Sequence, residues 1–195
     1  MERKVAERRK LIVGNWKMNG LCEAGSALAE QLAAKALASP PSSEVVVCPP
    51  ATLLAKINTA FEASPIALGG QDCHAAEKGA HTGDVSPEML RDAGCQYVIV
   101  GHSERRGDHT EDDAAVQAKA AAANRTGMTG IICVGETGAE RDAGDTLHTV
   151  GRQVAGSLPQ GAHGANTVVA YEPVWAIGSG HTPTLAEIGA VHQYI

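Results

Sequence analysis

The fold of this chain is decided by the stretch AYEPVWAIGS at residues 170–179. Its first residues continue an apolar run that predicts a strand, and Pro173 ends that strand directly after Glu172. A carboxylate in this position lies at the rim of a sheet. The stiff Pro-Val-Trp segment and the Gly-Ser-Gly turn that follow are suited to a moving lid. The stretch therefore predicts a base from which water can be kept away.

Strands and helices alternate along the whole sequence. Short runs rich in β-branched residues predict six strands, at Lys10–Trp16, Glu44–Cys48, Ile66–Gln71, Tyr97–Gly101, Gly130–Val134 and Thr167–Tyr171. The stretches between and after them predict six helices, at Leu21–Ala38, Thr52–Ala63, Ser86–Ala93, Asp112–Arg125, Asp142–Ser157 and Thr184–Ile195. This alternation is typical of an α/β fold with a parallel sheet and helical crossovers. No linker or low-complexity segment divides the chain, so residues 1–195 are expected to form a single domain.

The last predicted helix carries its own start signal. Thr184 and Glu187 have the T-x-x-E spacing of a capping box. The residues expected to share the apolar face of this helix are Leu185, Ile188, His192 and Ile195.

Composition and charge exclude several classes of protein. A formal net charge of −6 argues against nucleic acid or an anionic membrane as the main partner. The five cysteines form no CxxC pair, which favours reduced thiols in a cytoplasmic protein. No apolar stretch reaches the roughly 18 residues of a membrane span. Residues 1–10 are charged and are expected to be a solvated lead-in rather than a secretory signal.

Three predicted strands end in polar side chains. With the period of two of a strand, an apolar row in each of them runs into ionisable or amide groups at its carboxyl end. Those groups are Asn15 and Lys17, His102 and Glu104, and Glu172. Because the active site of a parallel α/β protein lies at this end of the sheet, we expect these side chains to gather there.

These residue types suit proton transfer next to a carbonyl group. Glu172 could remove a proton from the carbon beside the carbonyl, and His102 could polarise the carbonyl oxygen. Lys17 supplies positive charge, and Asn15 a neutral donor or a fixed dipole. A phosphate on the substrate would explain the lysine, and the backbone N–H groups around Gly178 and Gly180 offer a second anion contact.

Each assignment has a structural alternative. Glu172 could be a solvated surface residue, although it lies between an apolar strand and the predicted lid. His102 could have a purely structural role, and Lys17 could be an ordinary exposed lysine. We expect otherwise for Lys17, because Trp16 and Met18 predict a largely buried segment.

Other polar groups have simpler roles. Glu104 could be a salt-bridge partner of Lys17 or Arg105, and positioning is favoured over proton transfer for it. Cys133 is expected in the core rather than as a nucleophile. The eight histidines are scattered, with neither HxxxH nor HExxH spacing, so no metal site is expected. The turn 178–180 is neither a P-loop nor a dinucleotide-binding motif, and no cofactor is expected.

Three segments carry a resemblance to a known family. The motifs GNWKMN at 14–19, GHSERR at 101–106 and AYEPVWAIG at 170–178 occur in the order and at the spacing found in triosephosphate isomerases, which the chain resembles over essentially all its length. The resemblance implies a TIM (β/α)8 barrel, with about six of the eight βα units in this chain. It also implies a cytoplasmic enzyme of glycolysis and gluconeogenesis. Such an enzyme interconverts dihydroxyacetone phosphate and glyceraldehyde 3-phosphate through an enediol(ate), without a cofactor.

The resemblance assigns the catalytic and binding roles of the family to individual residues of this chain. By motif, Glu172 is the base, His102 the electrophile and Lys17 the electrostatic and phosphate ligand. Residues 71–84 resemble the dimer loop of the family, which implies a homodimer in which Thr82 reaches towards the partner's site. The other residues carried over are Asn15, Gly178 and Ser179 as substrate-binding residues and Glu104 as a supporting residue.

The sequence also departs from the family pattern. Ser179 replaces the usual threonine of the lid, and His-Thr-Pro at 181–183 replaces Lys-Thr-Ala, so that Pro183 narrows the backbone freedom of the hinge. The resemblance further implies that Ile195 lies within the sixth helix, before the seventh and eighth βα units and their phosphate-binding loops. An inactive barrel fragment that acts through association is therefore the alternative. A third alternative, another phosphate-sugar barrel enzyme such as an aldolase, would need a Schiff-base lysine deep in the sixth strand, whereas Glu172 occupies the corresponding rim.

Overall fold

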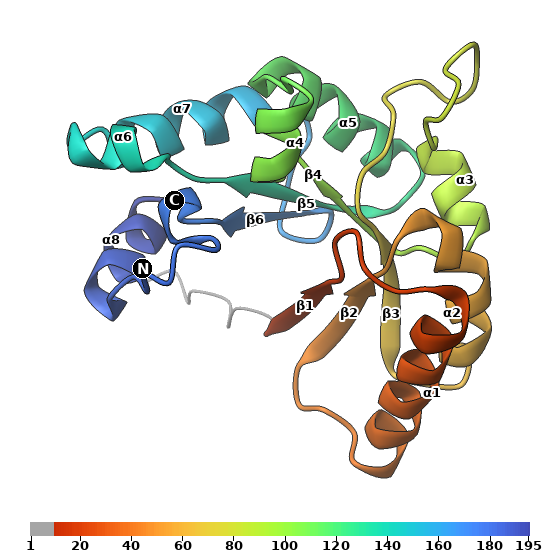
Figure 1. Cartoon of the computed structure of the whole chain (residues 1–195). Coiled ribbons are helices and arrows are strands. Elements are labelled where there is room, and N and C mark those ends of the chain that lie inside the picture. The colour runs from red at the N-terminus through yellow and green to blue at the C-terminus, as the bar shows by residue number, and fades with distance from the viewer. Residues whose placement is uncertain (1–9) are drawn as a thin grey trace, which may run out of the picture. The chain divides into compact units, whose positions relative to one another are not determined.

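The computed structural model describes residues 10–195, which divide into two compact units (Figure 1). The described part of the first unit contains residues 10–71 and 90–97, and the second unit contains residues 72–89 and 98–195. The predicted lead-in at residues 1–10 lies outside the described residues except for Lys10. The expectation of a single domain stays a prediction.

The first unit is built on three parallel strands. Strand β2 pairs with β1 and with β3, with Val46 opposite Val13 on one side and opposite Ala67 on the other. Helix α1 packs against α2, and α2 against β3. The elements of this unit are β1 (Leu11–Asn15), α1 (Cys22–Ala38), β2 (Glu44–Cys48), η1 (Ala51–Leu53), α2 (Leu54–Phe61) and β3 (Ile66–Gly70).

The burial of these elements follows their sequence patterns. In β1 the residues alternate between half-buried and exposed, which confirms the period of two that places Val13 and Asn15 on one face. All five residues of β3 are buried, as expected for an interior strand of a parallel sheet. Helix α1 buries its small residues, among them Ala29 and Ala33, so that its backbone can approach its neighbours closely.

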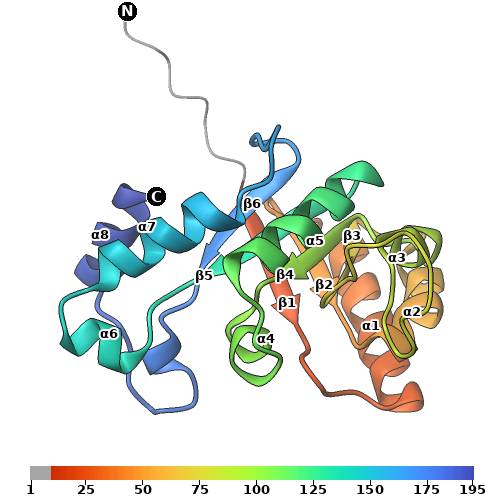
Figure 2. The ribbon, with the colours of Figure 1, turned by 90° about the horizontal axis from the view of Figure 1, so that it is seen from above.

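The second unit carries most of the helices. Strands β5 and β6 pair in parallel, with Ile132 opposite Val169. Helices α5 and α7 lie side by side and both contact β5 (Figure 2). The elements are α4 (Ser103–Asp108), α5 (Asp113–Arg125), β5 (Thr129–Val134), α6 (Gly138–Asp142), α7 (Thr146–Ser157), β6 (Thr167–Tyr171), η2 (Val174–Ala176) and α8 (Leu185–Tyr194). Helix α3 (Pro87–Asp92) and strand β4 (Tyr97–Val100) cross the division between the units.

All six predicted strands are confirmed, and β2 and β6 have the predicted bounds. The prediction of one helix over Asp142–Ser157 is wrong, because Gly144, with a φ of 81°, separates α6 from α7. The helix predicted from Thr52 begins as the 3-10 turn η1. The short elements α4 and η2 were not predicted.

Helix α8 confirms one prediction and corrects another. The capping box of Thr184 and Glu187 is present, since each side chain accepts a hydrogen bond from the other residue's backbone N–H. The predicted apolar face is wrong, because Leu185 is 88% exposed and the buried residue is Val191. Helix α8 packs against α7, and Val191 is its buried residue.

Two expectations from composition can be compared with the structure. The five cysteines form no disulfide with one another; Cys22 is exposed, and Cys133 is among the four that are buried, as expected for a core residue. Among the described residues, no helix combines the length and apolar character needed to cross a bilayer.

Candidate active site

Glu172 follows β6 directly and extends its pairing with β5. Its backbone N–H donates to the carbonyl oxygen of Val134 at 2.7 Å, and Pro173 then ends the strand. The carboxylate is 18% exposed, and both of its oxygens are engaged. Oε1 lies 2.7 Å from Nε2 of His102, and Oε2 accepts the backbone N–H of Ser103 at 3.1 Å. The predicted base and the predicted electrophile are therefore in direct contact.

His102 is the N-cap of helix α4, and this position fixes the state of its ring. Its Nδ1 accepts the backbone N–H of Glu104 at 3.2 Å. A nitrogen that accepts an amide hydrogen carries no proton, so the proton of the neutral ring is on Nε2 and is donated to Glu172. The carboxylate of Glu104 also lies 3.5 Å from Nδ1 and would favour a proton there, but the backbone N–H is held in place by the helix and occupies the lone pair of Nδ1. His102 thus presents an N–H group beside the base.

The environment of Glu172 keeps it ionised. Burial alone would raise the pKa of this carboxyl group. The hydrogen bond and electrostatic attraction of the His102 N–H group, the backbone N–H of Ser103 and the thiol of Cys133 outweigh burial and lower the pKa below its ordinary value of 4.5. A carboxylate in this state is ready to accept a proton at neutral pH.

A cavity of about 290 Å³ borders the carboxylate. Ser103, Cys133, Gly135 and Val174 line it together with Glu172. This volume is near the lower end of the range of small-molecule sites, about 300 Å³. The base therefore faces a space of the size that a small substrate needs.

The stem of the predicted lid is anchored on a buried carboxylate. Glu136 is fully buried and accepts hydrogen bonds from Nε1 of Trp175 at 2.9 Å and from the hydroxyl of Tyr171 at 3.0 Å. Arg141 lies 3.4 Å from the same carboxylate and places its guanidinium 4.3 Å from the centre of the Trp175 ring. Burial, and then the negative charge of Glu136, raise the pKa of Tyr171 to about 12. The segment after Glu172 is therefore held by charge-assisted contacts.

The tip of the predicted lid differs from its stem. Residues 171–176 are half-buried, whereas residues 177–182 are exposed. Gly178 and Gly180 have φ angles of 68° and 78°, which glycine adopts readily. Ser179 stabilises the turn by donating to the carbonyl oxygen of Ala176 at 3.2 Å and accepting the N–H of His181 at 3.1 Å.

In the first unit, Asn15 and Lys17 lie at the end of β1. The side-chain oxygen of Asn15 accepts the backbone N–H of Lys17 at 2.9 Å. Gln71, which follows β3, donates to the carbonyl oxygens of Lys17 at 2.8 Å and of Cys48 at 2.9 Å. These bonds hold Lys17 at a φ of 52°, a conformation that costs a residue other than glycine about 1–2 kcal/mol. The prediction that Met18 is buried is wrong, because its side chain is 96% exposed at the start of the following loop.

The structure thus brings the predicted residues together in two groups. One group is Asn15 with Lys17, and the other is His102, Glu104 and Glu172. Thr82 is exposed in the loop between β3 and α3. Four further groups support these sites without having been predicted to do so from the sequence, namely Gln71, Ser103, Cys133 and Glu136. Gln71 and Glu136 could have been found, because Gln71 ends one predicted strand and Glu136 closely follows another. Ser103 acts through its backbone, which no side-chain pattern reveals.

Comparison with known proteins gives a consistent result. The model of the triosephosphate isomerase family matches residues 10–195. A triosephosphate isomerase from Dinoroseobacter shibae is 58% identical over 188 residues, which cover 96% of this chain and 75% of that protein. One from Rhodopseudomonas palustris (strain BisA53) is 59% identical over 189 residues, which cover 96% of this chain and 74% of that protein.

The structure agrees with these matches. The crystal structure of triosephosphate isomerase from Bartonella henselae superposes with a TM-score of 0.85 at 44% sequence identity, covering 96% of this chain and 74% of that one. The predicted fold class is confirmed, an α/β chain of the TIM-barrel type with six βα units. This chain therefore belongs to the triosephosphate isomerase family.

Proposed function

We propose that this chain interconverts dihydroxyacetone phosphate and D-glyceraldehyde 3-phosphate by proton transfer through an enediol(ate) intermediate. The observation that carries the proposal is the 2.7 Å contact between Oε1 of Glu172 and Nε2 of His102. An ionised carboxylate and an imidazole N–H side by side match the two needs of the reaction, a base for a carbon acid and a donor for the carbonyl oxygen.

The reaction moves protons and leaves the oxidation state of the whole molecule unchanged. Glu172 removes a proton from the carbon next to the carbonyl, and the electron pair moves onto the carbonyl oxygen. The Nε2–H of His102 stabilises that oxygen as charge develops on it. The hydroxyl proton of the second oxygen moves to the first oxygen, relayed by the imidazole of His102, so that the first oxygen becomes a hydroxyl group. The carboxylic acid of Glu172 then returns a proton to the carbon that carried the original carbonyl, and the new carbonyl group forms on the second oxygen. A carboxylate base with a neutral imidazole is the established pairing for this family.

The substrate must displace a hydrogen bond that the carboxylate of Glu172 makes in the resting site. Both oxygens of Glu172 are occupied, one by His102 and the other by the N–H of Ser103. The carboxylate must leave at least one of these donors before it can reach a carbon-bound proton. In the proposed sequence the substrate carbonyl takes over the Nε2–H of His102, which frees Oε1 for the proton.

The remaining roles are proposed from the family motifs. We assign to Lys17 the positive charge that balances the substrate phosphate, and to Asn15 a contact with the substrate. Gly178 and Ser179 would donate backbone N–H groups to the phosphate as the lid closes. Glu104 would position His102 through the N–H that Nδ1 accepts.

A coupled assay of the 195-residue chain tests the proposal. Turnover should appear with either triose phosphate as substrate. His102→Gln and Glu172→Asp should lower kcat by about 10²–10⁴-fold, the usual contribution of general acid–base groups. His148→Gln, which changes an exposed histidine of α7, is the matched control and should keep full activity. A folded chain without turnover would instead support the inactive-fragment alternative.

We also propose that the chain acts in the cytoplasm as a homodimer, with Thr82 at the contact. The exposed position of Thr82 supports this assignment. Sedimentation velocity should give the mass of a dimer at micromolar concentration, and Thr82→Arg should shift the species towards a monomer. A wild-type chain that sediments as a monomer up to about 100 μM, a concentration at which protein pairs of only moderate affinity still associate, would contradict the proposal.

A further inference from the structure

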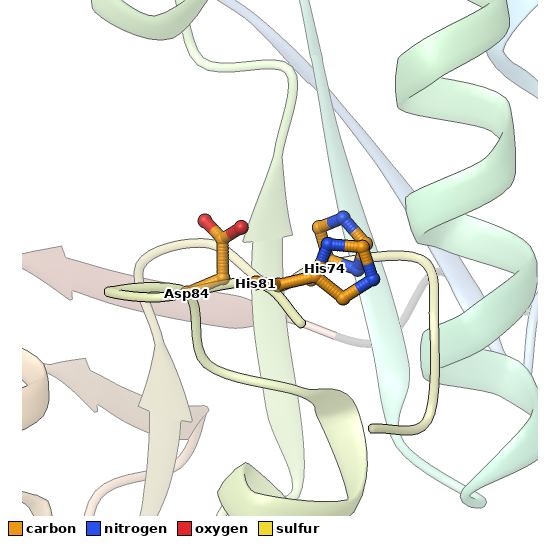
Figure 3. A group of neighbouring side chains, drawn as sticks. All are labelled: His74, His81 and Asp84. Atoms are coloured by element: carbon orange, nitrogen blue, oxygen red, sulfur yellow. The ribbon is translucent and has the colours of Figure 1, made fainter. Parts of the chain in front are cut away.

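The loop between β3 and α3 brings together three groups that bind metals. His74, His81 and Asp84 each offer one ligand atom, and these atoms all lie within 4.8 Å of one another. Figure 3 shows the two imidazole rings one over the other, with the carboxylate of Asp84 beside them. The ring centroids are 3.9 Å apart. The histidines are seven residues apart in the sequence, so no metal-binding spacing revealed them.

Backbone hydrogen bonds hold the loop in the shape that makes the cluster. The N–H of His74 donates to the carbonyl oxygen of Val85 at 2.9 Å, which ties the two ends of the loop together. The N–H of Asp84 donates to the carbonyl oxygen of His81 at 3.1 Å and closes a turn. Gly83 permits this turn with a φ of 95°. His81 and Asp84 are thereby fixed on the same turn, with His74 at the base of the loop.

A small cavity coincides with the cluster. It has a volume of about 50 Å³, and His74, His81 and Asp84 all line it. Four ligands around Zn²⁺ at about 2.1 Å lie roughly 3.4 Å from one another in tetrahedral geometry. The ligand atoms must therefore move closer together, and the stacked imidazole rings must turn so that their nitrogen lone pairs converge on the ion.

From these observations we propose that His74, His81 and Asp84 bind one late first-row transition-metal ion, with Zn²⁺ as the reference. Two imidazoles and one carboxylate are ligands that suit zinc, copper and nickel, whereas Mg²⁺ and Ca²⁺ prefer oxygen ligands. Water completes the coordination sphere. The site uses none of the residues assigned to the isomerase reaction, but His81 and Asp84 flank Thr82, so in the proposed homodimer the ion would bind at the contact between subunits. The proposal revises the expectation from sequence that the chain has no metal site.

Two contacts oppose binding and limit its strength. Nδ1 of His74 accepts the backbone N–H of Ala76 at 3.0 Å, so His74 must give up this hydrogen bond or turn its ring over. The loss costs about 1 kcal/mol. Lys78 also lines the cavity and adds positive charge. A three-ligand site of moderate affinity is therefore expected, rather than a structural site that folds the chain.

Calorimetric titration with Zn²⁺ tests the site. The full chain carries Cys22→Ser, because Cys22 is an exposed thiol that could itself bind zinc. We expect one Zn²⁺ per chain and no comparable binding of Mg²⁺. His81→Ala and Asp84→Ala should each weaken Zn²⁺ binding by at least about tenfold, the smallest effect usual even for an outer-shell partner. His148→Ala, which removes an exposed histidine of α7, should leave the affinity unchanged.

Three results would overturn the proposal. They are the absence of Zn²⁺ binding, equal affinity in His81→Ala and the parent chain, and an equal loss in His148→Ala and His81→Ala. Circular dichroism of each variant shows whether it is folded, so that a loss of Zn²⁺ binding in a folded variant is attributed to the missing side chain. Isomerase activity does not enter the measurement, and its absence would leave the metal result intact.

Discussion

Gly135 lies so close to the backbone of Glu172 that no side chain fits between them. A Cβ atom at this position would be 1.7 Å from the carbonyl oxygen of Glu172. Gln153 fixes the glycine by hydrogen bonds to its N–H at 2.7 Å and its carbonyl oxygen at 3.1 Å. At the residue scale, the position of the base therefore depends on a residue that has no side chain.

Gly135→Ala should move Glu172 away from His102. Because backbone rather than a flexible side chain blocks the new methyl group, we expect a loss of stability of about 1–3 kcal/mol and a fall in kcat. Urea unfolding and the coupled assay measure both. Gly130→Ala is the matched control, since its Cβ would be 3.9 Å from the nearest atoms, those of Ala120. Equal effects of the two substitutions would contradict this account.

The ionisation of Glu172 should appear in the pH dependence of stability. The pKa of this carboxyl group is lowered on folding, because His102, Ser103 and Cys133 outweigh the effect of burial. The ionised form therefore stabilises the folded state above the ordinary pKa of 4.5, and this contribution is lost as the pH falls through the lower folded-state value.

The free energy of unfolding of Glu172→Gln should accordingly differ most from that of the wild type at neutral pH. The difference should shrink below pH 4.5. Urea unfolding of both proteins between about pH 3.5 and 7 measures it, around the usual range of a glutamate pKa. A difference that stays constant over this range would show that folding does not lower the pKa of Glu172.

At the scale of elements, the segment after Glu172 combines a fixed stem with an exposed turn. Glu136 follows β5 as Glu172 follows β6, and it holds Tyr171 and Trp175. The tip at 177–182 is exposed. This division is what a hinged lid requires, since the stem sets its direction and only the tip must move.

Tyr171→Phe should weaken the stem. The change leaves the buried carboxylate of Glu136 with one donor fewer, and we expect a loss of stability of about 1–3 kcal/mol. Tyr194→Phe removes the same hydroxyl from a side chain that is 53% exposed, and it should change stability by less than about 0.5 kcal/mol. Urea unfolding compares the two variants, and equal losses would exclude a special role for the Glu136 contact.

Some elements could be predicted from the sequence and others could not. The strands β2 and β6 are apolar runs with clear ends, so their bounds were predicted correctly. Helix α4 was missed because its six residues, SERRGD, are polar and carry no apolar period. The break between α6 and α7 depends on the left-handed conformation of Gly144, and a single glycine within a helical pattern does not establish such a break.

At the scale of the whole molecule, the sequence motifs identify the family, and the structure adds the contacts within each unit. The predicted pairing of the base with an imidazole appears as the direct contact of Glu172 with His102. The residues that support this pair act through backbone groups or close approach, as Ser103 and Gly135 do. Contacts of this kind arise from the tertiary packing of the chain and leave no side-chain pattern. The sequence could therefore predict the reacting groups but only a few of the residues that support them.

Deuterium incorporation reports directly on the proton that Glu172 transfers. The full chain is incubated with dihydroxyacetone phosphate in D₂O, and the product is analysed by NMR and mass spectrometry. Proton transfer through an enediol(ate) on Glu172 predicts deuterium on the carbon next to the carbonyl, and Glu172→Asp should slow its appearance by about 10²-fold or more. Deuterium that appears equally fast in Glu172→Asp and the wild type, or a folded chain that neither exchanges nor turns over the substrate, would rule out proton transfer by Glu172.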